Sequence, residues 1–294
     1  MTSVLETVVR GLGLGSVYAL LALGFVIIYK ATRVISFAQP AFMLTGVVMV
    51  TYLVQVMDFW LALLAAVALS SLLGLVAERL VIRPMVGRPV FTVAIITLGV
   101  DVALRVVANA FMGLEVRQVG DPWGLRTFTI GSARVEHRDI ASVAAMLIVM
   151  AMLFAFFRFS RWGLAMRAAA GDQEAALLQG VSVGAVFAMS WAMAAGLAAV
   201  AGTFHAAGSD VDGSIWVVAL VALPVIILGG LDSLAGAVIA GLAVGVLQET
   251  AAKYQHLAPW LGANIAPLTP YLLMMLVLLF RPYGLLGTRD VERV

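Results

Sequence analysis

The sequence contains no cysteine, which excludes disulfide bonds and thiolate metal sites. Charge is scarce as well: Asp, Glu, Lys and Arg make up 12% of the 294 residues, against about 25% in soluble globular domains. The net charge of +2 is small, so we expect no nucleic-acid partner. By contrast, 63% of the residues are hydrophobic, more than the roughly 45–50% apolar residues of soluble domains. The composition therefore predicts an all-α polytopic integral membrane protein.

Three missing motifs narrow the chemistry further. There is no G-x-x-x-x-G-K-[ST] loop, so the chain is not expected to cradle nucleotide phosphates itself. The histidines His137, His205 and His256 lie far apart and form no H-E-x-x-H motif, so we expect no metal site and no intramembrane enzyme. The amino-terminal residues MTSVLETVVRG lack a basic region followed by a cleavage site, which predicts a retained first span.

Long apolar runs dominate what is present. A membrane-spanning helix needs about 20 mostly apolar residues. Nine segments are candidates, within an expected range of eight to ten: Thr7–Tyr29, Phe37–Met57, Phe59–Ile82, Val90–Met112, Ile140–Phe157, Val183–Ala207, Ile215–Gly230, Ser233–Ala251 and Leu268–Phe280. The seventh is short and contains Pro224, which predicts a half-helix or a re-entrant segment. We treat residues 1–294 as one transmembrane domain.

Basic residues orient these spans. They gather around the ends of spans one, three, five and nine: Lys30, Arg33, Arg79, Arg83, Arg88, Arg158, Arg161, Arg167, Arg281, Arg289 and Arg293. The positive-inside rule then predicts an external amino terminus and a cytoplasmic carboxyl terminus, in a bacterial inner membrane. The loop at residues 113–139 opposes this rule, because it is predicted outside yet carries four arginines.

The same outer loop contains a segment rich in strand-forming residues. Leu125–Val135 is interrupted by Gly131-Ser132, which predicts a small hairpin. Such a hairpin is either a cap that meets an external delivery protein or a simple connection between two spans.

A polar island at residues 158–183 separates spans five and six. Within it, Asp172 suits the N-cap of a short helix, because its side chain can accept hydrogen bonds from the first turn. Glu174 suits the positive end of the helix dipole, and Gly180 can supply a left-handed stop. These residues predict a short surface helix held between two spans, which is either a coupling element or an ordinary connector.

The residues Glu174-Ala175-Ala176-x-x-x-Gly180 resemble the motif with which importer-type ABC permeases dock onto their ATPases. Four blocks extend the resemblance over the chain: Gly11–Gly46, Arg161–Val183, Ile227–Gly245 and Leu278–Gly287. Together they resemble the H-type permease subunits of branched-chain amino-acid ABC transporters. The resemblance implies an importer permease with broken helices and a cytoplasmic coupling helix.

It also implies partners: a second permease subunit or a second copy, two cytoplasmic ABC ATPases and an external solute-binding protein. No cofactor is expected in this chain, since ATP and Mg²⁺ would bind the ATPases. The coupling residues are then Arg161, Arg167, Asp172, Glu174, Ala175 and Gly180. The solute would be a branched-chain amino acid or a related small polar solute such as an amide or urea. An ion- or proton-coupled secondary transporter is the alternative.

Two segments supply candidates for the translocation path. On the first span, Gly11 and Gly15 form a small-xxx-small step that suits helix packing. The resemblance implies that the stretch after them lies near the permease interior, which makes Ser16 and Tyr18 candidates to line the path. In the second span, Pro40 is expected to interrupt the helix, and broken helices expose backbone groups to transported solutes. The path candidates here are Ser36, Phe37, Gln39 and Pro40, where the resembled family usually has Asn-Phe-Ala-His-Gly.

The last path candidates are Asp101 and Arg105 in the fourth span, one turn apart on one face. A charge at mid-bilayer is unfavourable by about 2.5–3.5 kcal/mol on insertion scales, so both must face protein or water. They form either a structural i,i+4 pair, which we favour, or an ion pair that contacts a zwitterionic solute.

Overall fold

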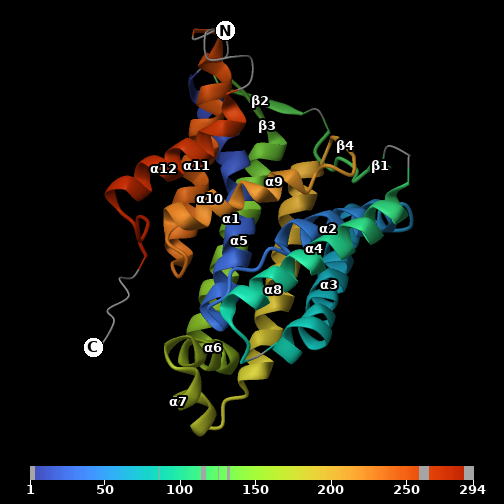
Figure 1. The fold of residues 1–294 in the computed structure, drawn as a ribbon. Helices are drawn as coiled ribbons and strands as arrows, with labels where there is room; N and C mark the ends of the chain where they lie inside the picture. The colour runs from blue at the N-terminus through green and yellow to red at the C-terminus, as the bar shows by residue number, and fades with distance from the viewer. Residues whose placement is uncertain are drawn as a thin grey trace.

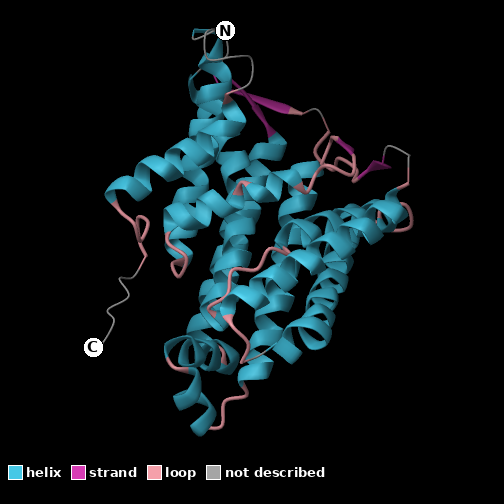
Figure 2. Cartoon of the chain, viewed as in Figure 1, coloured by secondary structure: helices cyan, strands magenta, loops and turns pink. Residues whose placement is uncertain are grey.

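Helices form the body of the protein in the computed structural model, which describes residues 4–85, 87–113, 117–124, 126–130, 133–257 and 265–287 (Figures 1 and 2). Within these described ranges, six helical segments are long and apolar enough to cross a membrane. They are built on α1 (Val4–Thr32), α3 (Phe59–Ala77), α4 (Val90–Met112), α5 (His137–Phe159), α8 (Val183–Ala206) and α11 (Leu234–Tyr254). The π-helix η1 (Glu78–Ile82) and the 3-10 helix η2 (Arg83–Met85) extend α3, and η3 (Gln255–Leu257) extends α11. The expected all-α membrane fold is confirmed.

Shorter helices complete the set at three of the predicted spans. These are α2 (Gln39–Leu53), the broken pair α9 (Val217–Leu220) and α10 (Ala222–Gly229), and α12 (Thr269–Phe280), which follows η5 (Ala266–Leu268). The expected half-helix containing Pro224 is therefore confirmed. The second span is corrected: Pro40 does not interrupt a helix that begins at Phe37 but lies in the first turn of α2, where a missing N–H leaves no bond unmade.

Helix α1 lies at the centre of the bundle. Its apolar window is 89% buried, and it packs against α5, α8, α10 and α11. By contrast, the corresponding windows of α4 and α5 are only 22% and 11% buried, so these helices turn most of their apolar surface outward. That surface suits lipid rather than water.

Glycines bring α1 and α11 into close contact. Gly11 and Gly15 face Gly245 and Gly241 across the interface, where an added Cβ would overlap the opposing backbone. A Cβ on Gly15 would lie 2.7 Å from Leu242 Cα. Small residues in this spacing let two helices approach, as the packing interpretation of the sequence predicted.

Short strands mark one end of the bundle, called here the hairpin end. Strands β2 (Thr127–Ile130) and β3 (Ala133–Glu136) pair antiparallel, which confirms the predicted hairpin; Leu125 and Gly131-Ser132 lie outside the described residues. Strand β1 (Arg117–Gln118) pairs with β4 (Asp210–Val211) nearby. The opposite end carries α6 (Arg161–Gly171) and α7 (Gln173–Leu178), at the bottom of Figure 1.

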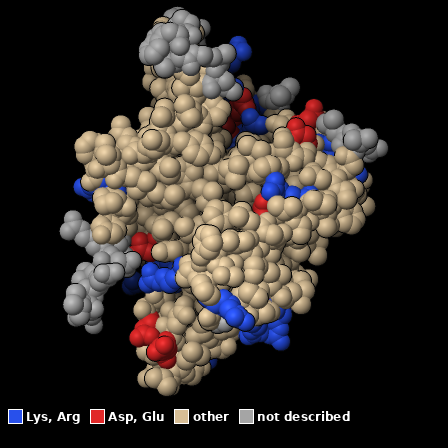
Figure 3. Space-filling view, in the orientation of Figure 1, with Lys and Arg blue, Asp and Glu red and all other residues tan. Residues whose placement is uncertain are grey.

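Two of the four loop arginines that oppose the positive-inside rule, Arg117 and Arg138, have local partners at the hairpin end, as does Arg10 of α1. Arg10 and Arg138 bond Glu136 at 2.7 and 3.4 Å. Arg117 lies over the ring of Tyr52, with 4.1 Å from its guanidinium carbon to the ring centroid. At the α6–α7 end, Figure 3 shows basic side chains crossing the lower part of the visible face. Arg289 and Arg293 lie outside the described residues.

Candidate functional site

The polar island forms two short helices whose ends are capped by their own side chains. Asp172 accepts hydrogen bonds from the backbone N–H groups of Glu174 and Ala175 at 2.9 and 3.0 Å. After α7, Gly180 adopts a φ of 81°, the left-handed conformation that favours glycine. The predicted N-cap and stop are both confirmed. Local chemistry alone therefore fixes the length of α7.

A tight elbow joins α5 to α6. Ser160 Oγ accepts a hydrogen bond from Gly163 N–H at 2.8 Å and caps α6. A Cβ on Gly163 would lie 2.6 Å from Phe157 Cα, so only glycine permits this close return of the chain. The elbow sets the direction in which α6 leaves the bundle.

The tip of this two-helix element is exposed. Leu177 and Leu178 are 56% and 88% exposed, although Ala176 between the helices is buried. The predicted coupling residues Arg161, Arg167, Asp172, Glu174, Ala175 and Gly180 are all exposed here as well. An apolar tip with charged flanks is a surface that a soluble partner could bind.

Two hydrogen bonds fasten the element to the end of α1. Gln173 Nε2 donates to the carbonyl oxygen of Ala31 at 3.0 Å, and Arg33 donates to the carbonyl oxygen of Ala170 at 3.0 Å. Sequence reasoning did not find these two contacts, because the bonded residues lie far apart along the chain. They connect the exposed element directly to the central helix.

Side chains of α4 bind two backbone N–H groups where the chain enters α2, one in the non-helical segment before the helix and one in its first turn. Phe37 N–H donates to Thr97 Oγ1 at 2.9 Å, and Ala41 N–H donates to Asp101 Oδ1 at 3.0 Å. The Ser36 hydroxyl accepts from Ala38 N–H at 3.3 Å. Irregular backbone inside a membrane requires such internal partners, since lipid supplies none.

Asp101 also pairs with Arg105 at 2.5 Å, which confirms that the two residues interact. The side chain of Asp101 is 6% exposed and that of Arg105 is 22% exposed. The Arg105 guanidinium carbon lies 3.9 Å from the ring centroid of Trp216. The pair thus joins α4 to the start of α2 and to the segment before α9.

The remaining path candidates are buried at helix contacts. Gln39 Nε2 donates to the carbonyl oxygen of Ala194 at 3.1 Å, whereas Gln39 Oε1 has no hydrogen-bond partner among the described residues. Ser16 Oγ donates to the carbonyl oxygen of Leu12 at 2.7 Å, and Tyr18 donates to Gln248 Oε1 at 3.0 Å. Asp101 and Arg105 thus lie beside Ser36–Pro40 at the start of α2, whereas Ser16 and Tyr18 lie on α1, and none of these residues lines the cavity described next.

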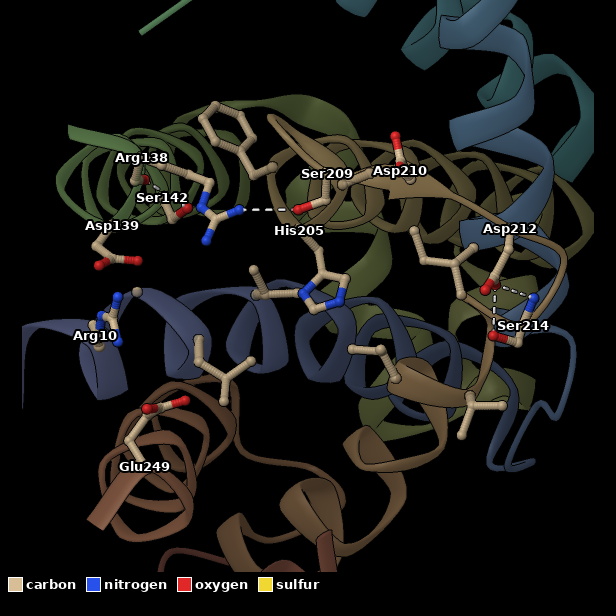
Figure 4. Close-up of a pocket in the computed structure, with 18 residues that line it drawn as sticks. Arg10, Arg138, Asp139, Ser142, His205, Ser209, Asp210, Asp212, Ser214 and Glu249 are labelled. Atoms are coloured by element: carbon tan, nitrogen blue, oxygen red, sulfur yellow. Dashed lines mark hydrogen bonds between the residues drawn. The ribbon is translucent and has the colours of Figure 1, made fainter. Parts of the chain in front are cut away.

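A cavity of about 600 Å³ opens near the hairpin end, and sequence reasoning missed it (Figure 4). Its walls come from α1, α5, α8, α11 and the segment from Ser209 to Val218. Its polar lining residues are Arg10, Arg138, Asp139, Ser142, His205, Ser209, Asp210, Asp212, Ser214 and Glu249. Two of them, His205 and Glu249, are titratable residues near the ends of predicted spans, which is a signal in the sequence that pointed here.

Charged groups at opposite ends of this cavity differ in their bonding. Arg138 donates hydrogen bonds to the Ala207 carbonyl oxygen at 3.1 Å and to Ser209 Oγ at 3.2 Å. At the far end, hydrogen bonds from the hydroxyl and the N–H of Ser214 hold the pKa of Asp212 below its usual value. Within the described ranges, no three His, Asp or Glu side chains are placed to hold a metal ion.

Known proteins resemble this chain over nearly its whole length. The family described as the permease component of the branched-chain amino acid transport system matches residues 7–280. The high-affinity branched-chain amino acid transport system permease protein LivH of Salmonella typhimurium is 28% identical over 99% of this chain and 97% of its own length. LivH of Escherichia coli K12 is 27% identical over the same shares.

The relative BraD of Pseudomonas aeruginosa, also a high-affinity branched-chain amino acid transport system permease protein, is 28% identical over 99% of this chain and 98% of its own length. No solved structure matches the chain. Because the family match covers all the helices described above, from α1 to α12, the chain belongs to the family of branched-chain amino acid transport system permease components.

Proposed function

We propose that this chain is the membrane-spanning subunit of an ATP-driven importer and that α6 and α7 form its docking element for an ATPase. The observation that carries this proposal is the exposed, doubly capped helix α7, fastened to α1 through Gln173 and Ala31. A helix of six residues keeps its shape alone only when capped, and a capped helix can transmit a displacement.

Orientation follows from the same element. Basic residues near the α6–α7 end support a cytoplasmic position for it, and the hairpin end and the amino terminus would then lie outside. Two ATPase chains would then bind ATP and Mg²⁺ below the membrane. A second permease subunit would lie beside the bundle, and a solute-binding protein would dock at the hairpin end, in a bacterial inner membrane. Arg161, Arg167, Glu174 and Ala175 would contact the ATPase directly.

The relatives' names point to branched-chain amino acids as the solutes. The mechanism assigned to this chain is mechanical rather than chemical. ATP binding would bring the two ATPases together and displace α7. Because Gln173 holds the Ala31 carbonyl oxygen, that displacement would reach the central helix α1, which packs against α8 and α11, and would alter access to the translocation path.

Substitutions on α7 test this proposal. Glu174→Ala, Gly180→Ala and Leu178→Ser should reduce ATPase co-purification and solute-stimulated ATP hydrolysis while leaving membrane insertion intact. Leu257→Ser is the matched control, because Leu257 is 69% exposed but lies at the end of η3, away from α7. If co-purification and stimulated hydrolysis survive all three changes, or if uptake runs on an ion gradient without ATP, the proposal is wrong.

A further inference from the structure

The cavity at the hairpin end contains one buried carboxylate without a partner. Asp139 is 9% exposed, and its Oδ2 atom accepts no hydrogen bond from the described residues. A buried polar atom left unpaired is unfavourable unless water, an ion or a ligand binds it. The unpaired Oδ2 of Asp139 therefore indicates a place where a hydrogen-bond donor binds.

The backbone of α1 is shaped to bring this carboxylate close. Gly13 faces Asp139, and a Cβ added at residue 13 would lie 2.7 Å from Asp139 Oδ1 and 3.0 Å from Asp139 Cα. Gly11 and Gly15 face the other way, toward α11. Helix packing against α11 thus accounts for two of these three glycines, and the third makes room for Asp139.

Charged side chains of both signs lie around Asp139 at this end of the cavity. Figure 4 places Arg10, Asp139 and Glu249 together, on α1, α5 and α11 respectively. Glu249 is close enough to act electrostatically on Asp139. Arg10 makes one ion pair, to Glu136, and the remaining N–H groups of its half-exposed guanidinium can still donate.

One wall of the cavity, next to α1 and α9, is apolar. Leu14 and Val17 of α1 line it together with Ile215, Val217 and Val218. Its volume of about 600 Å³ lies within the roughly 300–1,000 Å³ typical of small-molecule sites. A charged end and an aliphatic wall together match a small amphoteric molecule with a hydrocarbon side chain.

We propose that this cavity receives the zwitterionic head group of an amino acid on the outer side of the permease: Asp139 and Glu249 accept its ammonium, Arg10 donates to its carboxylate, and the aliphatic wall holds its side chain. The assignment rests on the proposed importer function and adds to it a binding site on the permease chain itself. Asp139 is the central residue, since among the residues that line the cavity it alone combines burial with an oxygen that has no partner among the described residues.

Binding to the assembled transporter in lipid nanodiscs tests the site, with radiolabelled L-leucine as the probe and no solute-binding protein added. Wild type should bind leucine, and unlabelled leucine should compete. The anion 4-methylpentanoate and the cation 3-methylbutylamine should compete at least about tenfold less well, because each lacks one charged group. Asp139→Asn should weaken leucine binding about tenfold or more.

Asp121→Asn is the matched control, because Asp121 is an exposed carboxylate at the same end that does not line the cavity. Its binding should equal wild type. Glu249→Gln is a second variant, on a half-buried residue whose change is less disruptive if Asp139→Asn fails to fold. Absence of leucine binding in wild type, equal competition by either analogue, or unchanged binding in both variants would overturn the assignment.

ATP-driven leucine uptake by proteoliposomes of the same sample, with the solute-binding protein present, separates the two proposals. If wild type takes up leucine and neither Asp139→Asn nor Glu249→Gln changes that uptake, the cavity proposal is rejected and the importer proposal stands. Absence of ATP-driven uptake in wild type would instead reject the importer proposal.

Discussion

Removing the carboxylate of Asp101 should strongly destabilise the fold. This side chain accepts the Ala41 N–H at the start of α2 and pairs with Arg105 at 2.5 Å, while its own residue is 4% exposed. Asp101→Ala leaves the Arg105 guanidinium without its anion and the Ala41 N–H without an acceptor. Both groups lie where lipid and packed side chains offer no replacement.

The magnitude follows from these contacts. Breaking a buried ion pair by removing one partner is unfavourable by about 3–5 kcal/mol, and an unsatisfied N–H adds about 1–3 kcal/mol. Arg105 keeps its contact with Trp216 and is 22% exposed, which lowers the first contribution. We therefore expect Asp101→Ala to lower the free energy of unfolding by about 3–5 kcal/mol. Asp101→Asn should have a smaller effect, because the amide oxygen can still accept from Ala41.

Equilibrium unfolding in detergent micelles measures the effect. Val102→Ala is the control, since Val102 is the next residue on α4 and is 52% exposed. Combining Asp101→Ala with Arg105→Met should recover at least about 1 kcal/mol, because the uncompensated charge is then gone. An Asp101→Ala effect no larger than that of Val102→Ala, or a double variant as unstable as the sum of its parts, would refute the reasoning.

Three further outcomes are expected. Gly241→Leu should destabilise the chain by about 1–3 kcal/mol, because a Cβ there would lie 2.7 Å from Ala19 N. Gly99→Leu is the control and should not destabilise it, because a Cβ at residue 99 would have nothing within 4 Å; thermal unfolding measures both variants. Asp172→Ala should destabilise α7 by about 0.5–2 kcal/mol and speed hydrogen exchange at Glu174 and Ala175, while Asp172→Asn should not. Gln39→Leu removes one hydrogen bond together with an unpaired oxygen, so unfolding should change little while solute uptake changes; an unaltered uptake profile would remove Gln39 from the path.

Local features of this fold were predictable from the sequence. Hydropathy located the long helices, because a helix that crosses the bilayer needs about 20 mostly apolar residues whichever helices it packs against. The ends of α7 followed from Asp172 and Gly180, whose effects reach only a few residues along the chain. The Asp101–Arg105 contact followed from helical spacing for the same reason.

Features that depend on distant segments were missed or displaced. The cavity brings together residues such as Arg10, Asp139 and Glu249, which are separated by more than a hundred residues each, and no local pattern encodes their meeting. The start of α2 was misjudged because the proline was interpreted as a break. Thr97 of α4 binds the Phe37 N–H in the non-helical backbone before α2, and Asp101 binds the Ala41 N–H in the first turn of α2. Only tertiary structure provides those partners.

Helix α1 connects the exposed element to the cavity. It is one uninterrupted helix of 29 residues, about 44 Å long, with Ala31 at one end bound by Gln173 and Gly13 toward the other facing Asp139. Glycine packing at Gly11 and Gly15 joins α1 closely to α11, whereas Asp139 belongs to α5. Because a continuous helix moves largely as a unit, a displacement of α7 that reaches Ala31 would shift α1 and α11 together against α5. The distance between Gly13 and Asp139, and with it the charged end of the cavity, would then change with the position of the docking element.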